Sequence, residues 1–191
     1  MNKIVRGVTN KLLICHLILC PLSAQALDTE TKEDTIKAIY SYKFGKFTEW
    51  PTSKLNLNSM GFCILGTNPF GQSALDAIEG KPIKGKTLHI KFFASGLLSS
   101  DALPECHILF VSQSEKHRVQ TIIDALHYQS ILTVSDIEGF SGNGGMVTLI
   151  NIENQIRFEI NPDNVKKAGL LMSSKLLGLA VIRHNGLEPS P

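Results

Sequence analysis

Short apolar segments alternate with segments of helical periodicity along most of this 191-residue chain, and this alternation limits the folds open to it. Strands are expected at 62–65, 87–93, 106–111 and 131–134, and helices at 34–50, from Asn68 onward and at 115–127. Strands that alternate with helices are typical of a parallel sheet with helices packed against its faces. We therefore expect one α/β domain with a mainly parallel sheet flanked by helices.

The last third of the chain has a different pattern. After the glycine-rich stretch 139–145, two apolar segments at 146–150 and 155–160 are separated by four polar residues, which predicts a late antiparallel hairpin. Asn161 and Pro162 then provide an N-cap and a first helical residue, and the expected helix runs to about Leu177. A glycine-rich loop that binds phosphate leads into a helix, but here a strand is expected to follow. We therefore interpret the glycines as a tight turn.

The N-terminus has the pattern of a cleavable secretory signal. Lys3, Arg6 and Lys11 precede the apolar run 12–19, and a small-residue site ends at Ala26. The apolar run is less than half of the roughly 20 residues needed to cross a membrane. We expect residues 1–26 to be removed near Ala26 and residues 27–191 to form the exported domain.

Removal of that segment changes the charge balance. It takes away three of the 19 Lys and Arg residues and none of the 17 Asp and Glu residues, leaving a formal net charge of −1. No block of basic residues remains that would bind nucleic acid, so no nucleic-acid partner is expected.

Two cysteines, Cys63 and Cys106, remain after the expected cleavage, each within an apolar segment. In an oxidising compartment, two thiols on strands that can be neighbours favour one disulfide. Such a bond would stabilise the fold by on the order of 4 kcal/mol. Two buried free thiols remain an alternative, as does a metal site that adds His89 or His107, although no paired-ligand spacing supports a metal.

Sequence motifs for catalysis are missing. No Gly-x-Ser-x-Gly occurs, and the cysteines are expected to be bonded to each other. We therefore expect a protein that is not an enzyme and has no cofactor.

Small polar side chains follow three of the expected parallel strands. They are Thr67 and Asn68, Ser112 and Gln113, and Ser135 and Asp136. Because the carboxyl ends of parallel strands share the edge where α/β proteins bind ligands, these residues could line a cleft for a small ligand. This pattern supports a small-ligand receptor or solute-binding protein as an alternative function. Helix caps and turns are the simpler explanation of the same residues.

Two segments carry more large apolar side chains than one core can cover. In the first helix, the expected core residues are Tyr40, Phe44 and Phe47. The residues expected to stay exposed as a possible partner surface are Tyr42, Trp50, Leu171 and Leu176. A homodimer or another protein could cover them.

Six motifs in order resemble the YfiR family of periplasmic regulators. They are Tyr40-x-Tyr42-x-Phe44-x-x-Phe47-x-Glu49-Trp50-Pro51, Phe62 to Gly66, Cys106 to Phe110, Leu132 to Asp136, Gly144 to Met146, and Phe158 to Asn161. Together they span nearly all of the chain after the signal.

The resemblance implies a non-enzymatic periplasmic repressor. Its partner would be the periplasmic sensor domain of a membrane-bound diguanylate cyclase, so that repression lowers cyclic di-GMP and biofilm formation. The resemblance also implies a homodimer, an outer-membrane lipoprotein that sequesters the repressor, and a disulfide between Cys63 and Cys106. Some relatives have a second cysteine pair around the glycine-rich turn, but this chain has none there, so redox control through that turn is not expected.

Overall fold

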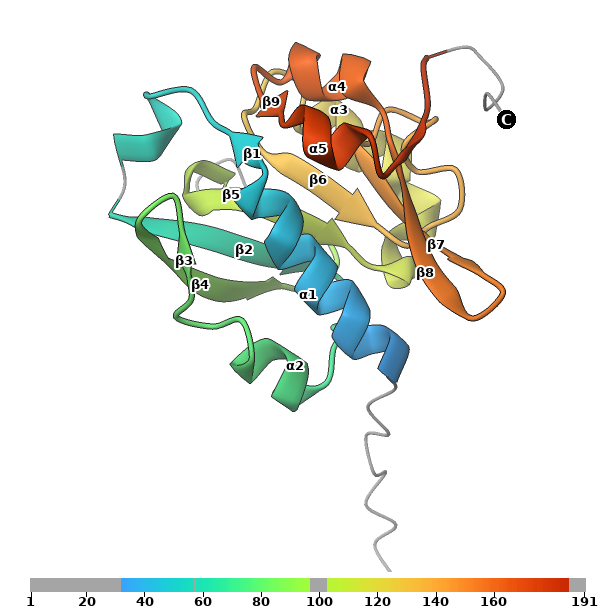
Figure 1. The fold of residues 1–191 in the computed structure, drawn as a ribbon, viewed down its shortest axis with the longest axis horizontal. Helices are drawn as coiled ribbons and strands as arrows, with labels where there is room; N and C mark the ends of the chain where they lie inside the picture. The colour runs from blue at the N-terminus through green and yellow to red at the C-terminus, as the bar shows by residue number, and fades with distance from the viewer. Residues whose placement is uncertain (1–31, 57, 97–102, 186–191) are drawn as a thin grey trace, which may run out of the picture.

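The structure is a computed structural model that describes residues 32–56, 58–96 and 103–185, so the expected signal segment lies outside the described residues. Its centre is a mixed, mostly parallel sheet of eight strands in the order β10-β8-β7-β6-β5-β2-β4-β3 (Figure 1). The strands are β2 (Ser59–Leu65), β3 (Pro82–Ile83), β4 (Lys86–Phe93), β5 (Cys106–Val111), β6 (Leu132–Ser135), β7 (Val147–Ile152), β8 (Gln155–Ile160) and β10 (Val181–Ile182). The predicted fold class is confirmed.

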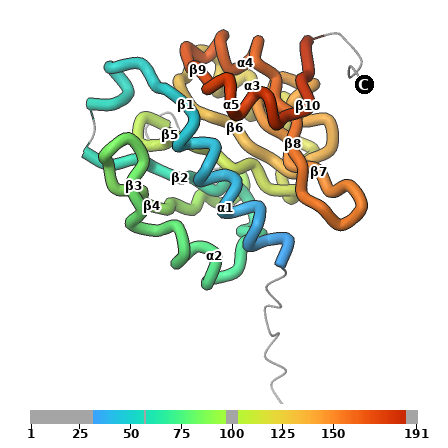
Figure 2. Tube along the Cα trace, viewed as in Figure 1, coloured from blue at the N-terminus to red at the C-terminus, as the bar shows by residue number. Residues whose placement is uncertain are grey.

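Strand pairing follows the predicted division of the chain. The strands β4, β2, β5, β6 and β7 are joined by parallel pairings, and β7 and β8 form the late antiparallel hairpin. Glu153 and Asn154 form its two-residue turn, with φ angles of 51° and 61°. A two-residue turn in which both φ angles are positive has a twist that matches the twist of the two strands. Figure 2 shows the C-terminal segment returning to β8, where β10 adds a parallel pairing.

Helices cover both faces of the sheet. The first face carries α1 (Lys32–Lys46), α2 (Gln72–Asp76), α4 (Pro162–Lys167) and α5 (Ser174–Leu177), and the second carries the 3-10 helix Gln113–Arg118 and α3 (Val119–Ala125). Alternate residues of β2 serve the two cores: Phe62 and Ile64 belong to the first, and Cys63 and Leu65 to the second. Two further 3-10 turns lie at Lys54–Asn56 and Leu103–Glu105. No helix within the described residues is long and apolar enough to cross a bilayer.

The first helix ends at Lys46 and not at Trp50 as predicted. The chain then forms β1 (Thr48–Glu49), which pairs antiparallel with β9 (Leu171–Met172) in a separate two-stranded sheet. The Thr48 hydroxyl donates to the Phe44 carbonyl at 2.8 Å, so a side chain bonds to a carbonyl of the last helical turn. The pairing of β1 with the distant strand β9 therefore decides where α1 ends.

Asn68 does not cap a helix. Its side chain accepts a hydrogen bond from the Phe70 N–H at 3.0 Å and donates to the Phe70 carbonyl at 2.8 Å, which makes a local turn. The helix begins later, at Gln72. The predicted helix at 115–127 is likewise shorter than expected and begins as 3-10 turns.

The predicted helix from Pro162 to Leu177 is two helices. Asn161 caps α4 as predicted, since its side chain accepts from the Asn164 N–H at 3.2 Å. Gly169 has a φ of +71°, and the chain passes through β9 before Ser173 caps α5. Because of this interruption, some apolar residues of the segment are buried, such as Leu170 and Leu176, and others are exposed, such as Leu171 and Leu179.

Candidate functional site

Cys63 and Cys106 form a disulfide, as predicted, and link the neighbouring strands β2 and β5. Both are fully buried in the second core, and their Cα atoms are 5.7 Å apart, within the range that a disulfide requires. The two residues are not opposite each other, because Cys106 faces Gly61 and Cys63 faces Leu109. The bond therefore crosses the strand pair diagonally within the scaffold.

A bulge explains this register. Along β5 the partner of Gly61 is Cys106 and the partner of Phe62 is Ile108, so His107 is an extra residue. The Gly61 N–H donates to Nδ1 of His107 at 3.1 Å, and Nε2 of His107 faces the Lys54 carbonyl at 3.1 Å. A Cβ on Gly61 would lie 2.0 Å from the Glu105 carbonyl oxygen, so only glycine fits there.

His107 is fully buried and neutral in this setting. Its ring lies against Trp50, with centroids 6.1 Å apart, on the face of the sheet opposite to the disulfide. Burial lowers the pKa of His107 to about 4, although its hydrogen bond to the Lys54 carbonyl acts in the other direction. His107 is thus held by backbone groups as part of the scaffold.

The six polar residues predicted at the strand ends do lie at one edge of the sheet, since β2, β5 and β6 are neighbours and parallel. Several of their groups are used within the fold. The Ser135 hydroxyl donates to the Val111 carbonyl at 2.7 Å, and the Gln113 amide donates to the Asp136 carbonyl at 2.7 Å. These bonds favour the simpler role of caps and turns, and a ligand cleft at this edge stays a prediction.

Asp136 joins this edge to the first helix. Its Oδ2 accepts from the Lys37 ammonium at 2.8 Å, and Lys37 also pairs with Glu33 at 2.8 Å. Burial lowers the pKa of Lys37, but the hydrogen bonds to Asp136 and Glu33 outweigh it and hold the pKa above its usual value. This ion pair holds the amino-terminal half of α1 against the strand ends.

Three of the four residues predicted to form a partner surface are buried. Tyr42 donates its hydroxyl to the Pro82 carbonyl at 3.1 Å, Trp50 lies against His107, and Leu176 packs into the first core. The prediction of exposure is wrong for these three, because the first core covers each of them. Leu171 is 67% exposed, in agreement with the prediction.

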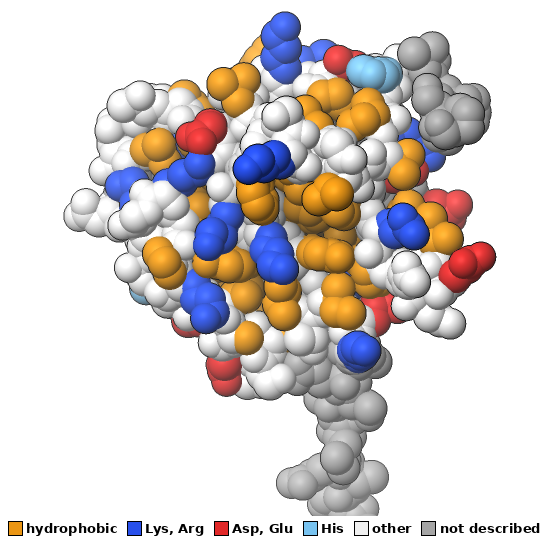
Figure 3. All heavy atoms as spheres, in the orientation of Figure 1, with side chains coloured by type: hydrophobic (Ala, Val, Ile, Leu, Met, Phe, Trp, Pro, Cys, Tyr) orange, Lys and Arg blue, Asp and Glu red, His pale blue; other side chains and the backbone are white. Residues whose placement is uncertain are grey.

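A different apolar surface lies around Leu171. Phe47 is 42% exposed and not in the core as predicted, and its carbonyl accepts from the Ser173 N–H at 3.0 Å, which places it beside β9. Leu179 is 76% exposed and lies just after Gly178, the C-cap of α5. We call Phe47, Leu171 and Leu179 the β9 surface; Figure 3 shows hydrophobic side chains gathered over α1 and α5.

Basic side chains accompany the β9 surface. Lys43 lies one helical turn before Phe47, Lys46 lies 5.7 Å from the centre of the Tyr42 ring, and Lys175 is on α5. Within the described part of the chain none of the three makes a salt bridge. The face in Figure 3 is accordingly apolar with interspersed positive charge.

The glycine-rich turn is held by buried polar contacts. The Ser141 hydroxyl donates to Glu159 at 3.0 Å, Thr148 lies 2.8 Å from Ser141, and Arg183 donates twice to the other Glu159 oxygen at 3.1 and 2.9 Å. Hydrogen bonds between charged groups are among the stronger ones. They tie the turn to β8 and to the C-terminal segment.

Comparison with protein families agrees with this architecture. A family model described as YfiR/HmsC-like matches residues 34–181, which extend from α1 to β10. No curated protein matches the chain. The matched region contains the sheet, the disulfide and the residues of the β9 surface.

Proposed function

The chain belongs to the YfiR/HmsC-like family, and from this premise we propose that it is an exported, non-enzymatic repressor that binds the periplasmic sensor domain of an inner-membrane diguanylate cyclase. Repression would lower cyclic di-GMP and biofilm formation. The proposed domain is residues 27–191 after cleavage near Ala26, and the disulfide fits a periplasmic location.

The observation that carries a binding role is the β9 surface. Phe47, Leu171 and Leu179 are large apolar side chains exposed to solvent by the backbone around β1, β9 and α5. Such a patch, mixed with cationic side chains, is typical of a site that another protein covers. A homodimer and an outer-membrane lipoprotein that sequesters the repressor are further proposed partners.

Binding to the cyclase is tested with the periplasmic domain of a cognate cyclase. We expect a complex by co-purification and calorimetry, and a rise in cyclic di-GMP when the chain is deleted. Leu171→Asp should weaken the complex by about tenfold or more, since it places a charge in an apolar contact. Unchanged cyclic di-GMP after deletion would overturn the repressor role.

The matched control is Ile152→Asp. Ile152 is 44% exposed but lies at the tip of the β7–β8 hairpin, away from β9. It should leave the affinity unchanged. Equal losses from the two variants would show that the β9 surface is not the contact.

A further inference from the structure

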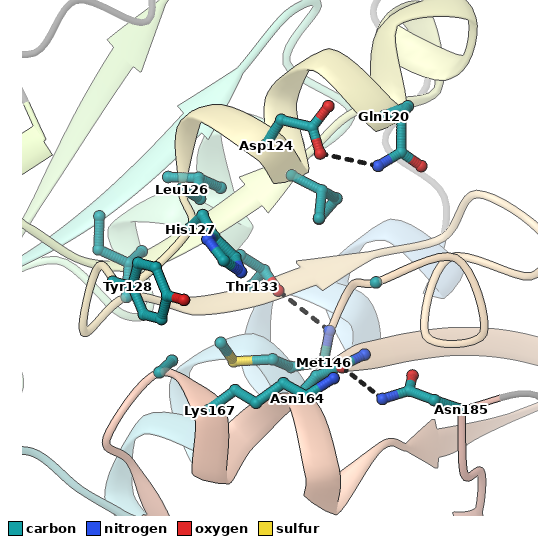
Figure 4. A pocket seen from close by; sticks show the side chains of 14 residues that line it. Gln120, Asp124, Leu126, His127, Tyr128, Thr133, Met146, Asn164, Lys167 and Asn185 are labelled. Carbon is teal, nitrogen blue, oxygen red and sulfur yellow. Dashed lines mark hydrogen bonds between the residues drawn. The ribbon is translucent and has the colours of Figure 1, made fainter.

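A cavity of about 270 Å³ lies at the amino end of β6, between the end of α3 and α4 (Figure 4). This is the opposite end of β6 from Ser135, so the cavity is separate from the predicted cleft. The cavity that one missing leucine side chain leaves in a protein core measures about 150 Å³. The space therefore has room for one large apolar side chain together with part of its backbone.

The inner wall of the cavity is apolar and held in place by the fold. Leu126, Ile131 and Met146 are buried side chains that line it. The Met146 N–H donates to the Thr133 hydroxyl at 3.0 Å, which fixes the strand end that carries this wall. An apolar group that enters the cavity would thus meet a preformed wall without ordering it.

The charged groups at the rim are of both signs. Asp124 lies on the α3 side, where its carboxylate accepts a hydrogen bond from the Gln120 amide at 2.9 Å. Lys167 lies on the α4 side. Because the two charges balance, the rim favours neither an anion nor a cation. The apolar wall is the feature that decides what fits the cavity.

The C-terminal segment leaves the described part of the chain at the rim of this cavity. Asn185 is part of the lining, and its side chain is held from two sides. Its amide donates to the Asn164 side-chain oxygen at 3.1 Å (Figure 4), and its own oxygen accepts from the Asn161 amide at 3.0 Å. These bonds to the start of α4 fix the point from which the following residues begin.

The residues that follow Asn185 include one large aliphatic side chain. They are Gly186, Leu187, Glu188, Pro189, Ser190 and Pro191, which lie outside the described residues. Each residue of an extended chain spans at most about 3.6 Å, so Leu187 can be no more than about 7 Å from Asn185. The family match ends at residue 181, before this segment. Leu187 is therefore tethered within reach of the apolar wall.

We propose that the Leu187 side chain docks into this cavity, so that the C-terminal segment of the chain covers its own apolar wall. The gain from burying one leucine and the entropy lost on ordering two residues are of similar size, so the docked segment is displaceable. This contact is independent of the β9 surface. Its test can fail while the proposed repressor function stands, and the reverse.

The first test compares amide chemical shifts of the exported chain and its variants at low protein concentration. Leu187→Ala should shift the amides of Gly144 and Met146, because it shortens the side chain that contacts the wall. Leu187→Met nearly conserves the volume and should shift them much less. Ser190→Ala, three residues further on, is the control and should leave them unchanged.

Two outcomes of this experiment would overturn the proposal. Unchanged amides in Leu187→Ala would show that the side chain does not reach the wall. Shifts of Gly144 and Met146 that appear only at high protein concentration would assign the cavity to a second copy of the chain.

Two engineered cysteine pairs locate the docked side chain. Leu187→Cys with His127→Cys, at the cavity rim, should form a disulfide under mild oxidation, because docking brings the two Cα atoms within the roughly 7 Å that the bond requires. Leu187→Cys with Lys166→Cys should react about fivefold more slowly. Lys166 is the matched control, since it borders a surface hollow together with Asn185 but lies outside the cavity lining. Equal rates for the two pairs would overturn the proposal.

Discussion

At the scale of single residues, His107 shows how one side chain sets a backbone register. The bulge in β5 takes the Gly61 N–H out of the regular ladder, and the imidazole accepts it. A buried N–H without a partner costs a few kcal/mol, so the ring has to stay neutral at Nδ1. Trp50 covers the ring from the helix side.

Acid should therefore destabilise the protein through His107. The folded pKa is about 4, below the ordinary 6.5, so on acidification the unfolded chain takes up the proton first. The contribution of His107 to the free energy of unfolding is fully present above pH 6.5. It falls by on the order of 3 kcal/mol as the pH is lowered to 4. His107→Gln, which does not titrate, should lack this loss.

Urea unfolding of both proteins between pH 4 and 7.5 measures this difference. The variant should be less stable at pH 7.5, and the gap should shrink as the pH falls. A gap that stays constant over this range would contradict the expected titration.

At the scale of elements, the scaffold depends on links between segments that are distant in sequence. The disulfide joins β2 to β5, and the contacts of Glu159 with Ser141 and Arg183 join the glycine-rich turn to the C-terminal segment. These links act on different parts of the sheet, because β2 and β8 are separated by β5, β6 and β7. The contacts at Glu159 are polar, so reducing agents break the link between β2 and β5 but not this one.

Cys63→Ser should destabilise the fold as much as the double variant with Cys106→Ser. Either change removes the same bond, which closes a long loop and is expected to contribute up to about 4 kcal/mol. Chemical unfolding of the two variants, with the reduced wild-type protein as reference, checks this. Clearly additive losses would mean that the two residues act separately.

At the scale of the whole molecule, charge is unevenly placed. After the expected cleavage the net charge is −1, yet Lys43, Lys46 and Lys175 surround the β9 surface without salt bridges in the described structure. Such an arrangement favours an acidic partner and accelerates its approach. Specificity would then come from the charges and contact energy from the apolar side chains.

Lys43→Glu should slow association with the cyclase domain several-fold at low salt. Lys116→Glu, on the 3-10 helix of the opposite face, makes the same charge change and should have little effect. The difference should fade toward 1 M salt, where charges are screened beyond about 3 Å. Stopped-flow association rates decide this, and a salt-independent loss would point to a disturbed fold.

Sequence patterns alone predicted the α/β class, the positions of the main strands along the chain, the late hairpin, the Asn161 cap and the Cys63–Cys106 pair. These features follow from local periodicity, from turn residues and from a count of cysteines, and they need no knowledge of distant contacts. The resemblance to the family added the proposed partner.

Only the tertiary structure decided which apolar residues face solvent. Tyr42, Trp50 and Leu176 are buried in the first core, whereas Phe47 is exposed beside β9, which pairs with β1 across more than 120 residues. The same holds for the His107 bulge, since it depends on how β2 and β5, which are far apart in sequence, pair. Local pattern determines which elements form, whereas burial of one particular side chain depends on what the fold places against it.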